Sequence, residues 1–250
     1  MRSFGLIGHP LSHSFSKKYF KEKFEKKGLL DCLFENYDLA DIRDFQPLLK
    51  DIPSLEGICV TIPYKQSVID FLDQTNDAVK IIGACNSIKI IDGKLFGYNT
   101  DAIGFEKSLL PKLRKNNTGA LVLGTGGSAK AVTYVLNKLG IDFIFVSRNV
   151  DPDHSKKMIH YNQVTPELLG THTLIINCTP VGMYPKIDQA PQINYSQINS
   201  AHYLFDLTYN PEESLFLKHG KQQGAQIQNG FDMLKFQAEA SWEIWNKDKI

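Results

Sequence analysis

The sequence has no excess of charge of either sign. Its 250 residues contain 28 lysines and arginines and 27 aspartates and glutamates, which gives a formal net charge of +1. A balance this even provides no overall attraction to nucleic acid or to an anionic membrane, although it allows a local basic pocket for a small anion. We therefore expect neither nucleic acid nor membrane as a partner.

Cysteines and long apolar stretches are also scarce. The four cysteines, Cys32, Cys59, Cys85 and Cys178, form no Cys-x-x-Cys pair. Three of them have apolar neighbours, so we expect buried free thiols in a reducing compartment. The first residues lack an apolar signal core, and no apolar run reaches the roughly 18 residues of a membrane span. These absences predict a cytoplasmic protein. No His/Cys/Asp cluster has metal-ligand spacing, so we expect no metal.

What the sequence does contain is a regular alternation of short apolar runs with helical patterns. Hydrophobic residues make up 42% of the chain, enough for a sizeable core. The alternation is typical of an α/β protein with a largely parallel sheet. The expected strands are Phe4–Ile7, Leu33–Tyr37, Gly57–Ile62, Ser87–Ile91, Ala120–Leu123, Phe143–Ser147, Thr173–Asn177, Tyr203–Asp206 and Ala225–Ile227. The expected helices are Ser16–Lys27, Tyr64–Leu72, Ala102–Leu110, Ala129–Leu139, Glu212–His219 and Phe231–Asn246.

The last expected helix indicates a discontinuous first domain. Its apolar residues form two neighbouring stripes at helical spacing, and Gln237 lies between them, so its amide should be buried and in need of a partner. Such a wide apolar face suggests that the helix returns to the N-terminal domain. With a polar break at 114–118 and Pro111 before it, we place the domain junction in the helix 102–110. The stripes are Phe231, Leu234, Ala238, Trp242 and Trp245, and Met233, Ala240 and Ile244.

A glycine-rich turn follows the expected strand Ala120–Leu123. Gly124, Gly126 and Gly127 lead through Ser128 into a helical pattern, with Ala129 at the position of a third glycine. Glycines permit a sharp turn and a close approach to a pyrophosphate, which the free N–H groups of a helix N-terminus then bind. This context favours a dinucleotide site in a Rossmann-like domain. The alternative is a purely structural turn.

The end of the next expected strand favours NADP over NAD. An acidic residue would accept the ribose 2′-hydroxyl of NAD there, but the chain has Ser147 and Arg148. A guanidinium suits a 2′-phosphate. The alternative is a solvated surface arginine.

Polar residues in the first hundred positions suggest a ligand site with acid–base chemistry. Ser14 and Ser16 form a hydroxyl edge for a polyhydroxylated or carboxylate ligand, although a helix N-cap would also explain one of them. Lys65 is expected in the first turn of a helix after Thr61, where the dipole and desolvation would lower its pKa toward that of an acid–base catalyst. Asp101 is either its partner or only an N-cap. A solvated lysine is the alternative for Lys65.

Taken together, the motifs resemble the shikimate dehydrogenase family, in the family's order and over nearly the whole chain. The segments that carry the resemblance are Ser14/Ser16, Val60–Lys65, Gly83–Ser87, Gly97–Asp101, Gly124–Ala131, Asn177–Met183, Asp206–Pro211 and Gly230–Ala238. The resemblance implies a two-domain enzyme that interconverts 3-dehydroshikimate and shikimate with NADP, in aromatic amino-acid biosynthesis. It implies a substrate-binding and catalytic domain at 1–101 with 230–250 returning, and a Rossmann-like NADP domain at 102–229.

The resemblance also assigns roles to residues. Lys65 and Asp101 would be the catalytic pair. Ser14, Ser16, Thr61, Asn86, Tyr209 and Gln237 would hold the substrate. The cofactor would be bound by Gly124, Gly126, Gly127, Ser128, Arg148, Asn177, Thr179, Pro180, Met183 and Gly230.

Three alternatives stay open at this point. One is a quinate/shikimate dehydrogenase that also uses NAD, and a second is a non-catalytic nucleotide-sensing protein on the same fold. Methylene-tetrahydrofolate dehydrogenase shares the architecture but would not need the Ser14/Ser16 edge. The chain departs from the family's usual residues at Ser147-Arg148-Asn149 and at Asp232. We expect the protein to be a monomer or a homodimer.

Overall fold

The computed structural model describes residues 1–11, 15–150 and 157–247. The chain divides into two compact units, Met1–Thr100 with Gln237–Ile250 and Asp101–Phe236. Each unit has its own six-stranded sheet with helices on its faces, so the predicted α/β fold class is confirmed.

The sheet of the first unit, which we call sheet A, is mixed. Its strand order is β2 (Cys32–Asp38), β1 (Arg2–Gly8), β3 (Leu55–Val60), β5 (Ser87–Ile91), β6 (Lys94–Tyr98) and β4 (Gln74–Thr75). Strand β1 runs parallel to β2 and β3, while β5 is antiparallel to β3 and β6. The carboxyl ends of β1, β2, β3 and β6 therefore share one edge of the sheet with the amino end of β5.

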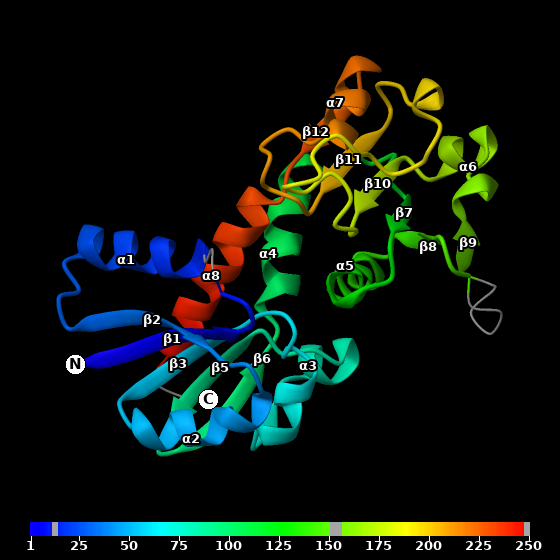
Figure 1. The fold of residues 1–250 in the computed structure, drawn as a ribbon. Helices are drawn as coiled ribbons and strands as arrows, with labels where there is room; N and C mark the ends of the chain where they lie inside the picture. The colour runs from blue at the N-terminus through cyan, green and yellow to red at the C-terminus, as the bar shows by residue number, and fades with distance from the viewer. Residues whose placement is uncertain (12–14, 151–156, 248–250) are drawn as a thin grey trace. The chain divides into compact units, whose positions relative to one another are not determined.

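Helices cover both faces of sheet A (Figure 1), and each face is buried. On one face, Phe4 of β1 packs with Phe20 of α1 (Phe15–Lys27) and with Trp245 of α8 (Phe231–Trp245). On the other face, Ile58 of β3 packs with Phe45 of α2 (Phe45–Asp51) and with α3 (Asp77–Ile82). Period-two strands place successive residues on opposite faces, so both sides carry a core.

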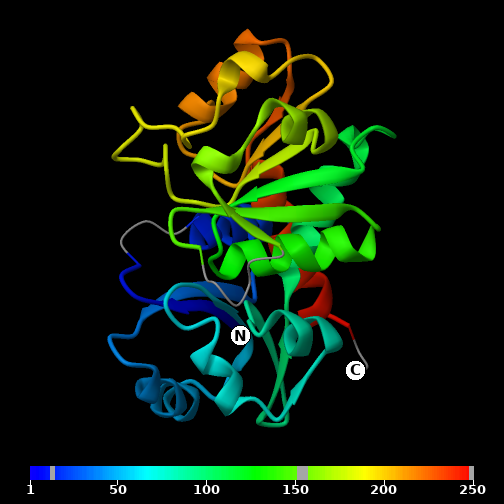
Figure 2. The same cartoon turned by 90° about the vertical axis from the view of Figure 1, so that its right-hand side faces the viewer.

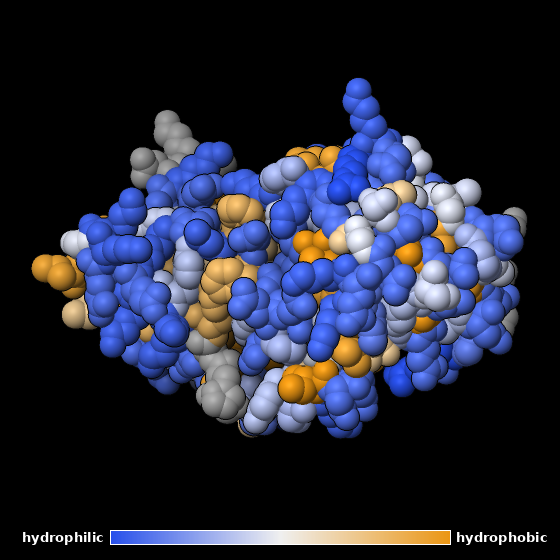
Figure 3. Space-filling model, turned by 90° about the horizontal axis from the view of Figure 1, so that it is seen from above, coloured by the Kyte–Doolittle hydropathy of each residue, from blue (hydrophilic) through white to orange (hydrophobic). Residues whose placement is uncertain are grey.

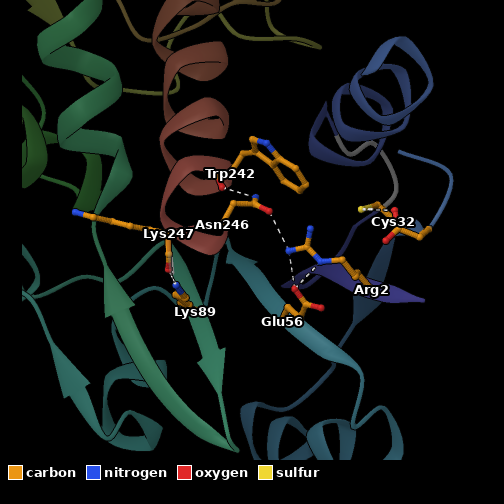
Figure 4. A network of polar contacts seen from close by, with 8 residues as sticks. Arg2, Cys32, Glu56, Lys89, Trp242, Asn246 and Lys247 are labelled. Carbon is orange, nitrogen blue, oxygen red and sulfur yellow. Dashed lines mark hydrogen bonds and ion pairs between the residues drawn. The ribbon is translucent and has the colours of Figure 1, made fainter. Parts of the chain in front are cut away.

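The predicted return of the last helix to the first unit is confirmed. Trp245 is only 3% exposed, and its ring lies 5.2 Å from that of Phe4 and 5.3 Å from that of Phe20. Figure 4 shows polar contacts that hold the end of this helix: Arg2 donates to Asn246, and Lys89 donates to a backbone carbonyl after the helix. The expected stripe is wrong at Phe231, which is 47% exposed in the first turn.

The sheet of the second unit, sheet B, is entirely parallel. Its order is β12 (Gln226–Gln228), β11 (Tyr203–Asp206), β10 (Leu174–Asn177), β7 (Gly119–Leu123), β8 (Asp142–Ser147) and β9 (Met158–His160). Helix α5 (Gly127–Lys138) lies along one face (Figure 2). The remaining α-helices are α4 (Thr100–Leu109), α6 (Pro166–Thr171) and α7 (Leu215–Gln222). The chain order reverses between β7 and β10, the place where open α/β sheets bind ligands.

The helix expected at Tyr64–Leu72 is wrong. Residues 62–66 form a turn, followed by a 3₁₀ helix, η2 (Ser67–Phe71). The Tyr64 amide donates to the carbonyl of Thr61, and its hydroxyl donates to the carbonyl of Leu39 at 2.6 Å, which fixes the turn. The expectation also missed α2, α3, α6, β4, β6 and β9, all of six residues or fewer except α2. Other 3₁₀ segments are η1 (Ile42–Asp44), η3 (Leu110–Lys112), η5 (Tyr161–Gln163) and η6 (Tyr195–Gln197).

Within the described ranges, no helix is both long enough and apolar enough to cross a bilayer. On the face drawn in Figure 3, hydrophilic residues predominate and apolar residues form small separate groups. This face therefore presents no broad apolar surface.

Candidate active site

Several of the predicted ligand residues lie at one edge of sheet A. Thr61 follows β3 and donates its amide to the carbonyl of Ile7 at 3.0 Å, while Asn86 precedes β5 and donates to Tyr98 at 3.1 Å. Val60 donates in turn to the carbonyl of Asn86 at 2.9 Å. Backbone hydrogen bonds thus fasten the segments that carry Thr61 and Asn86 side by side.

A buried amide network stands at this edge. Asn86 and Thr100 form two hydrogen bonds: Asn86 Nδ2 donates to Thr100 Oγ1 at 2.9 Å, and the Thr100 amide donates to Asn86 Oδ1 at 2.6 Å. Gln237 of α8 is 7% exposed, which confirms the predicted burial of its amide. Its Oε1 receives long contacts from Asn86 at 3.4 Å and Thr100 at 3.5 Å. The chain's last helix and the Asn86 segment therefore meet in one polar cluster.

Lys65 lies at the same edge of sheet A, but on a different element from the one that the sequence predicted. It lies in the turn before η2, not in the first turn of an α-helix, so the helix-dipole argument for its chemistry is wrong. Its backbone carbonyl accepts a hydrogen bond from the amide of Cys85 at 2.7 Å, and Cys85 directly precedes Asn86. The half-buried Lys65 is thus anchored beside the Asn86 segment.

Asp101 is the second residue of α4, not its N-cap. It directly follows Thr100, and Asn99 before them donates its side-chain amide to the carbonyl of Ala84 at 2.9 Å. A carboxylate in the first turn stabilises a helix through its dipole, so a structural role alone also accounts for an acid here.

The other predicted substrate residues are more scattered. Ser16 is the second residue of α1 and half-buried, and Ser14 lies outside the described residues. Tyr209 follows β11 in the second unit and is 41% exposed. Of the six, the structure brings together Thr61, Asn86 and Gln237.

The second unit has a pocket of about 740 Å³ at the carboxyl ends of β7, β8 and β10. Backbone bonds align these ends, since Gly124 donates to Val146 and Cys178 donates to Leu123. Five of the predicted cofactor residues line it: Gly124, Gly126, Arg148, Thr179 and Pro180. Sequence reasoning missed Thr125, Val146, Tyr161, Cys178, Val181 and Gln189–Gln192, which also line it; Ser147 and Asn149 complete the wall.

The glycines leave this pocket open. Gly124 has φ +94°, and a Cβ there would lie 2.8 Å from the Thr179 methyl group. Gly126 caps α5 and Gly127 begins it, two residues before the predicted start, and a Cβ on either would meet no protein atom within 4 Å. The helix N-terminus therefore presents unobstructed N–H groups, as binding of a pyrophosphate requires. The adjoining Ser128 is exposed in the same first turn.

Charge on the pocket wall favours a phosphorylated ribose. Arg148 is exposed beside Ser147, and no acidic residue is among the described residues that line the pocket. Burial raises the pKa of Tyr161, and the charge of Arg148 opposes that rise. The donor set therefore fits the 2′-phosphate of NADP better than the free 2′-hydroxyl of NAD.

Five predicted cofactor residues do not line the pocket: Gly127 and Ser128 in the first turn of α5, and Asn177, Met183 and Gly230. Asn177 is fully buried behind it and accepts hydrogen bonds from the amide and hydroxyl of Thr179 at 3.1 and 2.6 Å. Met183 is 46% exposed on the following loop. Gly230 packs so tightly that a Cβ would lie 2.1 Å from the carbonyl oxygen of Leu207, which gives this glycine a structural reason.

All four cysteines are free thiols, as expected. Cys59 and Cys85 are buried as expected, but Cys178, which was expected to be buried too, is partly exposed, as is Cys32. Across the part of the chain that the structure describes, no group of three or more His, Cys, Asp or Glu side chains could hold a metal ion.

Comparisons with known proteins find similar sequences in one family. A family model described as "Shikimate dehydrogenase substrate binding domain" matches residues 6–88. The chain is 40% identical to the shikimate dehydrogenase (NADP(+)) of Clostridium beijerinckii, over 100% of this chain and 94% of that protein.

Solved structures are similar over nearly the whole chain. A shikimate dehydrogenase in complex with NADP+ has a TM-score of 0.87 and 32% identity, covering 98% of this chain and 90% of that one. The enzyme of Thermus thermophilus, in complex with NADP(H) and shikimate, has a TM-score of 0.86 and 27% identity, covering 98% and 94%.

Proposed function

The chain belongs to the shikimate dehydrogenase family, and we propose that it catalyses the reversible, NADPH-dependent reduction of 3-dehydroshikimate to shikimate. The observation that carries the proposal is the pocket of sheet B, where a glycine-lined helix N-terminus meets Arg148 and no described acidic residue. This reaction would serve aromatic amino-acid biosynthesis.

The first unit would bind the substrate. Shikimate carries hydroxyl groups and a carboxylate, and the buried amides of Asn86 and Gln237 with the hydroxyls of Thr61 and Ser16 offer donors and acceptors for them. Ser14 and Tyr209 complete the proposed substrate set. Gln237 belongs to the set because its buried side chain meets Asn86 and Thr100 at this edge of sheet A, at 3.4 and 3.5 Å.

The second unit would bind NADP. Gly124, Gly126, Gly127 and Ser128 surround the open N-terminus of α5 and would hold the pyrophosphate. Arg148 would pair with the 2′-phosphate. Beyond the pocket's Thr179 and Pro180, the proposed set includes Asn177, Met183 and Gly230.

Lys65 and Asp101 would handle the proton. When bound, NADPH supplies a hydride to the substrate carbonyl carbon. Lys65 would give a proton to the carbonyl oxygen or stabilise the alkoxide, and Asp101 would orient the amine and share the proton. Support comes from the anchoring of Lys65 beside the Asn86 segment and from the position of Asp101 next to Thr100.

We further propose that the protein acts in the cytoplasm on small molecules alone, as a monomer or a homodimer, with no nucleic acid or membrane as a partner. The two predicted domains would divide the work, with substrate on 1–101 and 230–250 and cofactor on 102–229.

Four assays on the purified protein test the proposal: oxidation of shikimate and of quinate, each with NADP and with NAD, followed by the absorbance of the reduced nicotinamide. We expect shikimate with NADP to give the highest kcat/KM. A preference for quinate or for NAD would replace the proposal with a quinate/shikimate dehydrogenase. No turnover in any combination, with NADPH still bound, would favour a nucleotide-sensing protein.

A further inference from the structure

A buried carboxylate at the end of β11 has no role in the reaction described above. Asp206 is fully buried, and its hydrogen bonds come from neutral donors. Oδ1 accepts from Asn177 Nδ2 and from the Thr208 amide, each at 3.0 Å, and Oδ2 accepts from the Ser214 hydroxyl at 2.5 Å. Burying a carboxylate among neutral donors is costly, so a function that needs this group is worth seeking.

The first consequence concerns the orientation of Asn177. An ionised carboxylate only accepts hydrogen bonds, so the Asn177 side chain must turn its NH₂ group toward Asp206. Its Oδ1 then faces the opposite way and accepts from the amide and hydroxyl of Thr179. Thr179 lines the pocket, and its methyl group packs against Gly124. Asn177 Nδ2 also donates to the carbonyl of Val181, at the longer distance of 3.3 Å, so the shorter bond to the charged Asp206 is the stronger of the two that orient the amide and, through it, Thr179.

The second consequence concerns the segment after β11. Asp206 fixes the amide of Thr208, which directly precedes Tyr209, and the hydroxyl of Ser214, which caps α7 through the Leu217 amide. One carboxylate therefore fastens the loops after β10 and β11 and the start of α7.

We propose that Asp206 is a positioning residue of the cofactor pocket, whose ionised carboxylate orients the Asn177 amide and, through it, Thr179 for NADP binding. This inference rests on the proposed function, because it takes NADP as the ligand of the pocket. Asp206 does not line the pocket and acts only through Asn177.

The ionisation of this group falls in an accessible pH range. Burial raises the pKa of Asp206 from its ordinary 3.8 to about 6. The titratable groups that face Asp206 are Cys178 and Tyr195. The pKa of each is raised, mainly by burial and secondly by the charge of Asp206. Both neighbours stay neutral between pH about 5 and 8, so Asp206 is the member of this group that titrates there.

The test compares NADPH binding by the wild type and by Asp206→Asn, measured by fluorescence titration without shikimate at pH about 8 and about 5. Asparagine has the same shape but can present either its oxygen or its NH₂ group to Asn177. At pH about 8 we expect roughly three- to tenfold weaker binding by the variant, as for the loss of one hydrogen bond. At pH about 5 the two dissociation constants should converge, because wild-type Asp206 is then neutral too. At each pH, the dissociation constant of the variant is divided by that of the wild type, and this ratio cancels the effect of protonation of the cofactor's own phosphate.

A second variant, Ser214→Ala, retains the carboxylate but removes one donor to it. Loss of the Ser214 hydroxyl should raise the pKa of Asp206 further, so NADPH binding should weaken at a higher pH than in the wild type. Because the same hydroxyl caps α7, the melting temperature should also fall.

The outcomes separate the two proposals. Equal NADPH dissociation constants for wild type and Asp206→Asn at pH about 8, or a ratio of the two constants that does not change with pH, would overturn the positioning role and leave Asp206 as a structural residue. A wild type that does not bind NADPH at either pH would overturn the proposed function, and this inference with it.

Discussion

Substitution of Gly57 by alanine tests the docking of the C-terminal helix on sheet A. A Cβ on Gly57 would lie 2.4 Å from Cδ2 of Trp245 and 2.6 Å from two further ring atoms. The ring must move by about 1 Å to restore an ordinary contact. The Phe4 ring stacks on it at 5.2 Å and the Phe20 ring packs against it, tilted, at 5.3 Å, so the Trp245 ring has little freedom to move.

The expected loss of stability follows from two opposing effects. Overpacking of this kind costs about 1–3 kcal/mol, while replacing glycine gains up to about 1 kcal/mol by restricting the unfolded chain. We expect a net loss of about 1–2 kcal/mol, or a melting temperature roughly 2–8 °C lower. Because Gln237 lies about 12 Å along the same helix, the KM for shikimate should rise while the KM for NADP stays unchanged.

Gly170→Ala is the matched control. Gly170 lies in α6, and a Cβ there would meet no atom within 4 Å, so this variant should be as stable as the wild type or slightly more stable. Adding Trp245→Phe to Gly57→Ala should cost less than the sum of the two single changes, because the smaller ring leaves space for the methyl group. A Gly57→Ala variant as stable as the wild type would refute the described packing of Trp245.

Four further predictions concern the site. Lys65→Ala should lower kcat by a factor of roughly 10²–10⁴ with the Kd for NADPH nearly unchanged; near-normal kcat would remove Lys65 from the mechanism. Arg148→Ala should raise the KM for NADP by about one to two decades, the value of a lost charge-assisted bond, and an equal effect on NAD would leave Arg148 a loop-supporting role only. Gln237→Ala should raise the KM for shikimate by a few-fold to about tenfold; a lower melting temperature with unchanged KM would make Gln237 a core amide. Burial raises the pKa of Asp206 from 3.8 to about 6. The folded state therefore favours the protonated side chain, whose contribution to the free energy of unfolding is complete below pH 3.8 and is lost as the pH rises through 6. Between pH about 4.5 and 7.5, the wild type should therefore lose about 2 kcal/mol more unfolding free energy than Asp206→Asn, and parallel urea-denaturation profiles would contradict this.

Sequence patterns predicted the long elements and missed the short ones for a physical reason. The buried strands of sheet B are continuous apolar runs, so β7, β8, β10 and β11 were each placed to within one residue. Strand β4 has two residues and α3 has six, too few for a period to become visible.

The site was predictable where chemistry is tied to a strand end and not where it depends on a loop. Gly124 and Arg148 follow buried strands, and both line the pocket. Gln189–Gln192 line the same pocket from an irregular loop with no recognisable pattern. Lys65 was placed on the wrong element, because a helix was expected directly after Thr61, where the hydrogen bond of Tyr64 to the carbonyl of Leu39 fixes a turn.

Transfer of a deuteron from substrate to cofactor tests the central claim most directly. The protein is incubated with NADP and shikimate deuterated at the carbinol carbon that is oxidised, and the reduced cofactor is analysed by mass spectrometry. We predict NADPH that carries the deuterium, since the hydride moves directly between the two bound molecules. Failure to form NADPH, or NADPH that carries no deuterium, would contradict the assignment of this chain as an NADP-dependent shikimate dehydrogenase.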